Sequence, residues 1–234
     1  MAARTPAGEP GSLTGAFGLL GFSGRFGNPY ESGDLDDPEE HPVPEGLYRW
    51  ARPGAAGTAE ELTIGFKSGT PVSVDGAELP LVELITTLNR RVGRHGIGRF
   101  SGLEHLAGGE KVLEVREMPA ALLLLRTARH LETAVLEAET IREKMHLEQI
   151  WVREALEGRW FGELRRASQN FMESCAEGVT GTVTWQLTGH GADTRAIRAE
   201  APRYVRSREE WERRSVAAES SPALTRHPLG RTYA

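Results

Sequence analysis

The sequence offers few side chains whose type and spacing suit catalysis. Cys175 is the single cysteine, and a lone cysteine is either a reactive thiol or, more often, a small buried apolar residue. His95 lies in the turn HGIGR, where it is either a general base or, more often, a structural hydrogen-bonding residue. The other histidines do not recur at the spacing of zinc ligands, so no metal site is expected.

A phosphate-binding loop is not expected either. Glycines recur at every third residue from Gly18 to Gly27, but neither the G-x-x-x-x-G-K-[ST] pattern nor a strand–loop–helix context surrounds them. We interpret this stretch as a mobile glycine-rich segment. A nucleophile–base pair is not evident around Glu104, in the predicted strand at 98–106. Its only candidates are His105 and Glu110, and they do not form a convincing pair.

Length and composition indicate one globular domain with extended ends. The chain has 234 residues, of which 39% are hydrophobic and 26% are charged, as in ordinary soluble domains. Its net charge of −5 gives no basic footprint for nucleic acid. The longest apolar run, Ala120–Leu125, is far shorter than the roughly 18 residues of a membrane span. With one cysteine and no persuasive signal peptide, we expect a cytoplasmic protein, and the bias towards Arg, Ala and Gly suggests a bacterial one.

The pattern divides the chain into three parts. Residues 1–60 are rich in Gly and Pro, carry an acidic run, and are predicted to be mostly irregular. Residues 61–200 carry the regular pattern of the main domain. Residues 201–234 are predicted to contain a short helix, because Ser207 and Glu210 have the spacing of a capping box, followed by an irregular tail.

Alternating apolar residues predict antiparallel hairpins in the main domain. We expect strand pairs at 62–66 with 71–74, at 98–106 with 111–115, and at 181–188 with 193–199. Helical spacing predicts helices at 81–88, 119–156 and 163–175, the second carrying a continuous apolar stripe. Because the helices do not alternate regularly with the strands, the fold class is α+β, with an antiparallel sheet of hairpins packed with long helices.

Short motifs between residues 20 and 200 follow one another in a distinctive order. They include Tyr30–Pro38 (YESGDLDDP), Ile64–Gly76 (IGFKSGTPVSVDG), Leu81–Asn89 (LVELITTLN), Gly93–Arg99 (GRHGIGR), Gly158–Trp160 (GRW) and Val179–Val183 (VTGTV). In this order and with nearly this spacing, they resemble the C-terminal synthetase and multimerisation domain of argininosuccinate synthases. The resemblance implies the α+β fold of that domain.

The resemblance also implies a substrate site. In that family two serines, the glutamate of V-E-N and the tyrosine of Y-E-x-P contact citrulline. Glu104 falls on that glutamate, whereas Arg116 replaces the tyrosine, and Leu20 and Pro29 replace the two serines. Tyr30 and Glu31 begin the segment that follows Pro29, and Lys111 falls on the lysine of K-S-R. The expected substrate-binding residues are therefore Glu104, Arg116, Pro29, Tyr30, Glu31 and Lys111, with no catalytic residue assigned.

The exchange of tyrosine for Arg116 leaves two interpretations open. In one, Arg116 points into a surviving pocket and binds a more anionic ligand, organised by Glu104, because a guanidinium forks onto carboxylate or phosphate. In the other, Arg116 and Glu104 form a salt bridge in a pocket that has lost its function.

The family's reaction requires ATP. It joins citrulline to aspartate through a citrullyl-adenylate, and its ATP-binding domain carries the motif S-G-G-x-D-[ST], which does not occur in these 234 residues. The resemblance therefore implies the synthetase-type subunit of a split, AMP-forming ligase, to which a separate PP-loop protein brings ATP and Mg²⁺. The amine donor would be aspartate, the other ligand an amino-acid-like small molecule, and the assembly a homo- or hetero-oligomer. The alternative is a non-catalytic binding or regulatory protein that keeps the fold.

Overall fold

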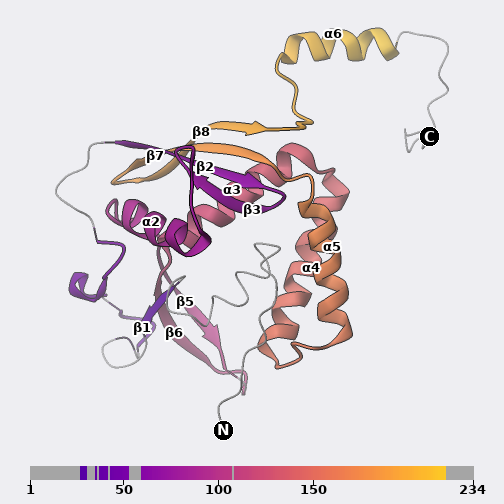
Figure 1. The fold of residues 1–234 in the computed structure, drawn as a ribbon. Helices are drawn as coiled ribbons and strands as arrows, with labels where there is room; N and C mark the ends of the chain where they lie inside the picture. The colour runs from indigo at the N-terminus through magenta and orange to yellow at the C-terminus, as the bar shows by residue number, and fades with distance from the viewer. Residues whose placement is uncertain are drawn as a thin grey trace. The chain divides into compact units, whose positions relative to one another are not determined.

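The computed structural model describes residues 27–30, 35, 37–41, 43–52, 59–106 and 108–219 (Figure 1). The chain divides into two compact units at Pro202, and each is described by itself. The structure confirms the expected α+β class. The glycines Gly18, Gly21 and Gly24 of the predicted mobile segment lie outside the described residues.

The first unit contains a five-stranded antiparallel sheet with the order β4-β3-β2-β7-β8. Its strands are β2 (Glu60–Lys67), β3 (Thr70–Val74), β4 (Ala77–Glu78), β7 (Gly181–Thr188) and β8 (Gly191–Ala199). The predicted hairpins 62–66 with 71–74 and 181–188 with 193–199 are therefore confirmed. Ser68 and Gly69 both have positive φ, as a two-residue hairpin turn requires. Asp75 and Gly76 repeat this conformation and lead into β4, which the sequence had not indicated.

Two helices, α2 (Leu81–Gly93) and α3 (Pro119–Val135), cover one face of this sheet. The alternation along β2 places Leu62, Ile64 and Phe66 in the core beneath them. Helix α2 contributes Leu84, Ile85 and Leu88 to the same core. The alternate residues of the strand and the residues three and four apart on the helix therefore form a single apolar layer. Burial of this layer from water is the main force that holds the unit together.

A second, three-stranded antiparallel sheet has the order β1-β6-β5. Its strands are β1 (Asn28–Tyr30), β6 (Lys111–Glu117) and β5 (Arg99–His105), so the predicted pair at 98–106 and 111–115 is also confirmed. A smaller apolar cluster of Leu35, Tyr48, Leu113 and Val115 packs here. The 3₁₀ helix η2 (Glu45–Leu47) precedes Tyr48. This sheet therefore recruits part of the N-terminal sixty residues, through β1 and the segment after η2.

The long helix predicted over 119–156 is wrong, because two helices occupy this range. After α3, Leu136 and Glu137 adopt extended conformations, and α4 runs from Ala138 to Leu156. No glycine or proline marks this break. Its cause is tertiary: Val135 and Leu136 belong to the core of the five-stranded sheet, whereas α4 leaves that core and packs along α5 (Glu163–Ala176).

The apolar stripe predicted along α4 faces outward. Met145, Val152 and Leu156 are all exposed, and the buried residues of α4 are Lys144, Trp151 and Glu154. The charged residues are buried because they are paired. Lys144 bonds Glu132 of α3 at 2.9 Å and also contacts Glu148. Arg129 contacts Glu132 at 3.0 Å and Glu148 at 2.9 Å, which closes a ring of four charges between α3 and α4.

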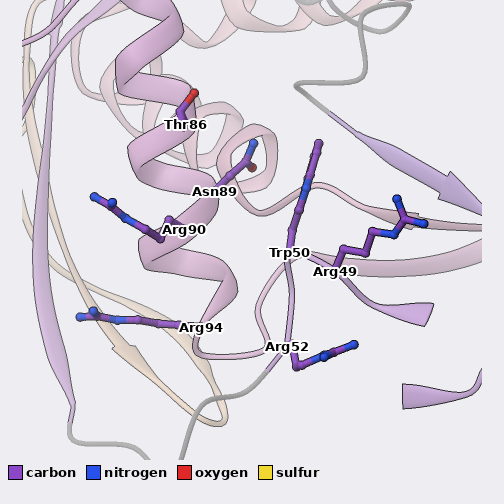
Figure 2. A pocket seen from close by; sticks show the side chains of 7 residues that line it. All are labelled: Arg49, Trp50, Arg52, Thr86, Asn89, Arg90 and Arg94. Atoms are coloured by element: carbon purple, nitrogen blue, oxygen red, sulfur yellow. The ribbon is translucent and has the colours of Figure 1, made fainter. Parts of the chain in front are cut away.

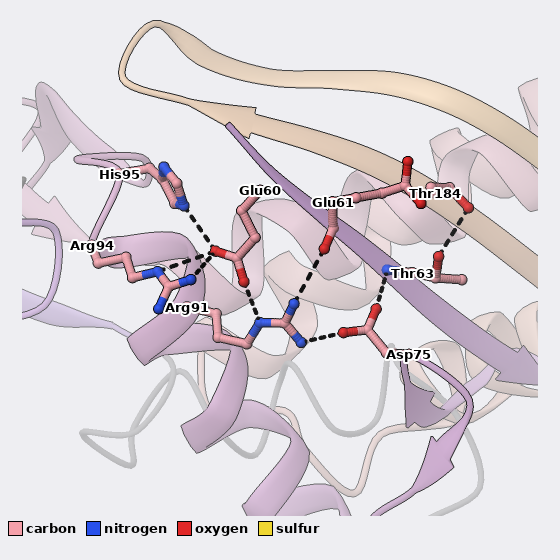
Figure 3. Close-up of polar contacts among 8 residues, drawn as sticks. All are labelled: Glu60, Glu61, Thr63, Asp75, Arg91, Arg94, His95 and Thr184. Atoms are coloured by element: carbon pink, nitrogen blue, oxygen red, sulfur yellow. Dashed lines mark hydrogen bonds and ion pairs between the residues drawn. The ribbon is translucent and has the colours of Figure 1, made fainter. Parts of the chain in front are cut away.

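Glu60, at the start of β2, holds the C-terminal end of α2 (Figure 3). It accepts hydrogen bonds from Arg91 at 2.7 Å and Arg94 at 3.1 Å, and it lies 2.9 Å from Nε2 of the buried His95. Arg91 also reaches Asp75, at 2.5 Å. The structure therefore places His95 in a network that joins strand, helix and turn.

In the second unit, α6 (Arg208–Glu219) begins after Ser207, whose Oγ accepts a hydrogen bond of 3.2 Å from the backbone N–H of Glu210. This bond has the geometry expected of an N-cap. Within the described part of the chain, no helix has both the length and the apolar character that crossing a membrane requires.

Candidate functional site

The three-stranded sheet separates the predicted site residues onto two faces. In register, Pro29 pairs with Arg116 of β6, and Arg116 pairs with Phe100 of β5. Side chains of directly paired residues lie on the same face, and successive residues alternate. Pro29, Arg116 and Glu104 therefore share one face, which we call the Arg116 face. Tyr30 and Lys111 lie on the opposite face, which carries Glu117. Leu20 and Glu31 lie outside the described residues.

Arg116 is held by carboxylates on its own face. Its guanidinium contacts Glu114 and lies 3.5 Å from Glu104. Glu114 is buried, whereas the side chains of Arg116 and Glu104 are 43% and 45% exposed. Two carboxylates against one guanidinium leave this cluster with one negative charge in excess. The pairing that the second interpretation required is thus present, and the contact of 3.5 Å is loose enough for a ligand to compete with it.

The same face is apolar around this cluster. Phe100 and Val112 are both exposed, 47% and 37% respectively. An exposed aromatic and an exposed valine beside a charged cluster give a surface that can bind a small molecule with an apolar part and a polar part. Nothing in this arrangement supplies an evident nucleophile, and no catalytic residue is assigned.

Glu117 organises the opposite face. It is fully buried, and its carboxylate accepts hydrogen bonds from Tyr30 Oη at 2.8 Å and Asn28 Nδ2 at 3.0 Å. Three consecutive backbone N–H groups, those of Arg49, Trp50 and Ala51, donate to it at 2.9, 2.8 and 2.7 Å. Five donors around one carboxylate compensate for its removal from water.

These contacts set the pKa values on this face. Burial alone would raise the pKa of Glu117, but the backbone and side-chain hydrogen bonds outweigh it and hold this pKa below its usual value. Burial, together with the hydrogen bond to Glu117, raises the pKa of Tyr30 to about 12. Tyr30 is therefore a neutral donor at physiological pH, and its role in the structure is to hold Glu117.

Arg99, which pairs with Glu117 in register, also fixes this segment. Its guanidinium makes two hydrogen bonds of 2.7 Å to Glu45, donates to the carbonyl oxygen of Ala51 at 2.8 Å, and lies 3.8 Å from the ring centre of Tyr48. Arg99 and Glu117 thus clamp the segment after η2. Both belong to motifs visible in the sequence, GRHGIGR and the E-x-P of Glu117–Pro119. Their partners are far away in the chain, so the sequence did not indicate this role.

The clamped segment forms one wall of a pocket against α2 (Figure 2). The pocket has a volume of about 400 Å³. It is lined by Arg49, Trp50, Arg52, Thr86, Asn89, Arg90 and Arg94. Four arginines and no carboxylate line it, so it suits an anion and not a magnesium ion. Elsewhere in the described ranges, no three His, Cys, Asp or Glu side chains come together as metal ligands would.

Comparison with known proteins shows the family to which this architecture belongs. The family described as "Arginosuccinate synthase C-terminal domain" matches residues 24–206. The chain belongs to this family. The match includes both sheets, the helices α2 to α5, and every residue of the predicted site, so the resemblance seen in the motifs is confirmed.

Among curated proteins, the chain is similar to several argininosuccinate synthases. It is 38% identical to that of Rubrobacter xylanophilus over 185 residues, which cover 79% of this chain and 45% of the relative. Against that of Synechococcus sp. (strain WH7803) the identity is 36% over 74% of this chain and 45% of the relative. The chain therefore spans less than half the length of the curated relatives that it matches. Membership of this family relates the fold of the chain to that of argininosuccinate synthases.

Proposed function

We propose that this protein is the synthetase-type subunit of an argininosuccinate synthase-like ligase that acts with a separate PP-loop protein. The observation that carries the proposal is the match of residues 24–206 to the C-terminal domain family. The partner would bind ATP and Mg²⁺, and this chain would bind the acceptor. The reaction would be AMP-forming C–N bond formation with aspartate as the amine donor.

In this proposal the Arg116 face contributes to the acceptor site. Glu104 keeps the position of a family residue that contacts citrulline, and Pro29, Phe100 and Val112 give the apolar border. The excess negative charge of Glu104 and Glu114 over Arg116 favours an acceptor that carries an ammonium group, as amino acids do. Such a ligand would take over part of the Glu104 charge that Arg116 now shares.

The proposed complex would work in the cytoplasm, where ATP and free amino acids are available. It would serve arginine biosynthesis or a specialised bacterial pathway in which aspartate donates nitrogen. We also propose that the chain is oligomeric, either with itself or with the PP-loop protein.

The test is to use the tagged chain as bait in a lysate of its native host, and then to assay the purified complex. We expect a stoichiometric PP-loop protein, and a complex that releases AMP and pyrophosphate with aspartate and an amino-acid acceptor, whereas neither protein alone does so. Glu104→Gln should lower that rate by about tenfold or more, because the acceptor loses a charged partner. The exposed loop residue Glu110 provides the matched control, since Glu110→Gln should leave the rate unchanged.

The second candidate is a non-catalytic binding or regulatory protein. The specific observation in its favour is that Arg116 is engaged by Glu104 and Glu114, as expected of a site that no longer binds the family's acceptor. Repeated recovery of the chain with only itself, under gentle conditions, would overturn the ligase proposal and leave this second one.

A further inference from the structure

The pocket between α2 and the segment 49–52 lies away from the Arg116 face. Its wall is formed by backbone that is bonded to Glu117, and Glu117 alternates with Arg116 along β6 and so projects from the opposite face. The pocket is therefore a separate feature of the fold. The inference drawn from it does not rest on the proposed ligase function.

The charge of this pocket is strongly unbalanced. Within the described residues, only Arg94 of the four lining arginines pairs with a carboxylate, Glu60, at 2.5 Å. Arg52 donates to the carbonyl oxygens of Tyr48 and Gly46 at 3.1 and 3.2 Å. For the guanidinium groups of Arg49 and Arg90, the described part of the chain provides no ion pair. The lining thus carries three guanidinium groups that no carboxylate of the described residues neutralises, and such groups attract an anion.

The aromatic side chain restricts the class of anion. Trp50 is half-buried and stands beside α2 near Thr86 and Asn89, with Arg90 and Arg94 extending to one side and Arg49 and Arg52 to the other (Figure 2). An indole face beside guanidinium groups is suited to a planar ring that stacks, joined to a phosphate that the arginines bind. A volume of about 400 Å³ falls within the range of small-molecule sites.

The pocket is also built in advance of any ligand. Glu117 and Arg99 hold the segment 49–51 at both its N–H groups and its carbonyl. Gly93 lets α2 approach this segment closely, because a Cβ at that position would collide with the carbonyl oxygen of Trp50. This wall is therefore ordered before a ligand binds, so binding involves no loss of conformational entropy in the segment 49–51.

We propose that this pocket binds a phosphate-bearing small molecule of the nucleotide class, with its ring against Trp50 and its phosphate bound by arginines of the lining. The test is calorimetric titration of the full chain with AMP, adenosine and pyrophosphate. We expect AMP to bind and adenosine to bind at least about tenfold more weakly, which corresponds to the loss of a charged anchor. Trp50→Leu should weaken AMP and leave pyrophosphate unchanged.

The double variant Arg49→Ala with Arg90→Ala should raise the Kd for AMP by about tenfold or more. Arg166→Ala with Arg195→Ala removes the same charge from exposed positions outside the pocket and should leave the Kd unchanged. Because Arg49→Lys with Arg90→Lys keeps the charge, it should bind AMP more tightly than the alanine pair even if truncation disturbs the wall. Equal affinity of the alanine pair and the native chain, or a Kd for AMP weaker than about 1 mM, would overturn the proposal.

Discussion

At the scale of single residues, Glu117 is a buried carboxylate with an unusually complete set of hydrogen-bond donors. Five hydrogen bonds converge on it, three of them from consecutive backbone N–H groups. A charged acceptor satisfies all of these donors at once, whereas a neutral amide carries hydrogen atoms that must face some of them. The carboxylate, and not merely the side chain's shape, therefore matters at this position.

We expect Glu117→Gln to lower the free energy of unfolding by about 2–3 kcal/mol, because buried donors lose their acceptor. Urea unfolding followed by circular dichroism measures this change. Glu110→Gln, at an exposed loop position, serves as the control and should change it by less than about 0.5 kcal/mol. Similar values for the two variants would show that the Glu117 contacts do not stabilise the protein.

The pH dependence of stability follows from titratable residues whose pKa differs between the folded and the unfolded chain. The pKa of Glu117 lies below its ordinary 4.5 for the reason given above. Burial alone would raise the pKa of Glu60, but its hydrogen bonds to His95, Arg91 and Arg94 outweigh burial. The pKa of Glu60 therefore also lies below 4.5. Burial and the nearby Arg126 lower the pKa of His130 from its ordinary 6.5.

In each case the folded state favours the deprotonated form. The stability from His130 is complete above pH 6.5 and that from the two carboxyls above pH 4.5, and each is lost as the pH falls through the folded-state pKa. We expect the Tm to fall progressively when the pH is lowered from 7 to 4, as measured by differential scanning calorimetry. The Tm of Glu117→Gln should fall less over the range below pH 4.5. A Tm independent of pH in this interval would contradict the assignment.

At the scale of elements, the ring of Arg129, Glu132, Lys144 and Glu148 defines how α4 leaves α3. Each member contacts two neighbours whose charge is opposite to its own. Lys144 and Glu132 are buried, so neither can be solvated if its partner is removed.

We expect Lys144→Met to lower the free energy of unfolding by about 3 kcal/mol, because Glu132 and Glu148 then face each other with only Arg129 to compensate them. Thermal unfolding measures this effect. The exposed pair Arg142–Glu139 on the same helix provides the control, and Arg142→Met should cost about 0–1 kcal/mol. An equally small loss for both variants would mean that the ring is not a stabilising feature.

At the scale of the whole molecule, the outer side of α4 and the turn into α5 expose an unusual number of apolar side chains. They are Met145, Val152, Leu156, Phe161 and Leu164. Single exposed apolar residues are common, but Met145, Val152 and Leu156 share one face of α4 by their spacing. Grouped apolar residues on one face are typical of an interface. Since α4, α5 and the turn between them supply all five, a second copy of this hairpin can meet the first by a two-fold axis.

We therefore expect self-association through this surface, measured as molar mass by light scattering after size exclusion. Leu156→Lys with Phe161→Lys should shift the mass towards that of the monomer, because two charges would be buried without partners. Val82→Lys, at an exposed apolar position of α2, should leave the mass unchanged. A native chain that is monomeric at every concentration would refute this expectation.

The sequence by itself determined the family, the α+β class and most elements, because their signals are local. Alternation in β2 and β7, positive-φ pairs such as Ser68–Gly69, and the motif order from Tyr30 to Val183 all lie within short stretches of chain. Only the tertiary structure decided the break at Leu136, because no glycine or proline marks it in the sequence. Residues before the break pack on the core of the five-stranded sheet, whereas those after it pack on α5.

The site shows the same division. The sequence placed Glu104 and Arg116 together, and register confirms a shared face, but only register could show that Tyr30 and Lys111 belong to the opposite one. The pocket beside α2 brings residues 49–52 to a helix more than thirty positions later. Such a neighbourhood is fixed by long-range bonds from Glu117 and Arg99, and no local pattern in the chain encodes it.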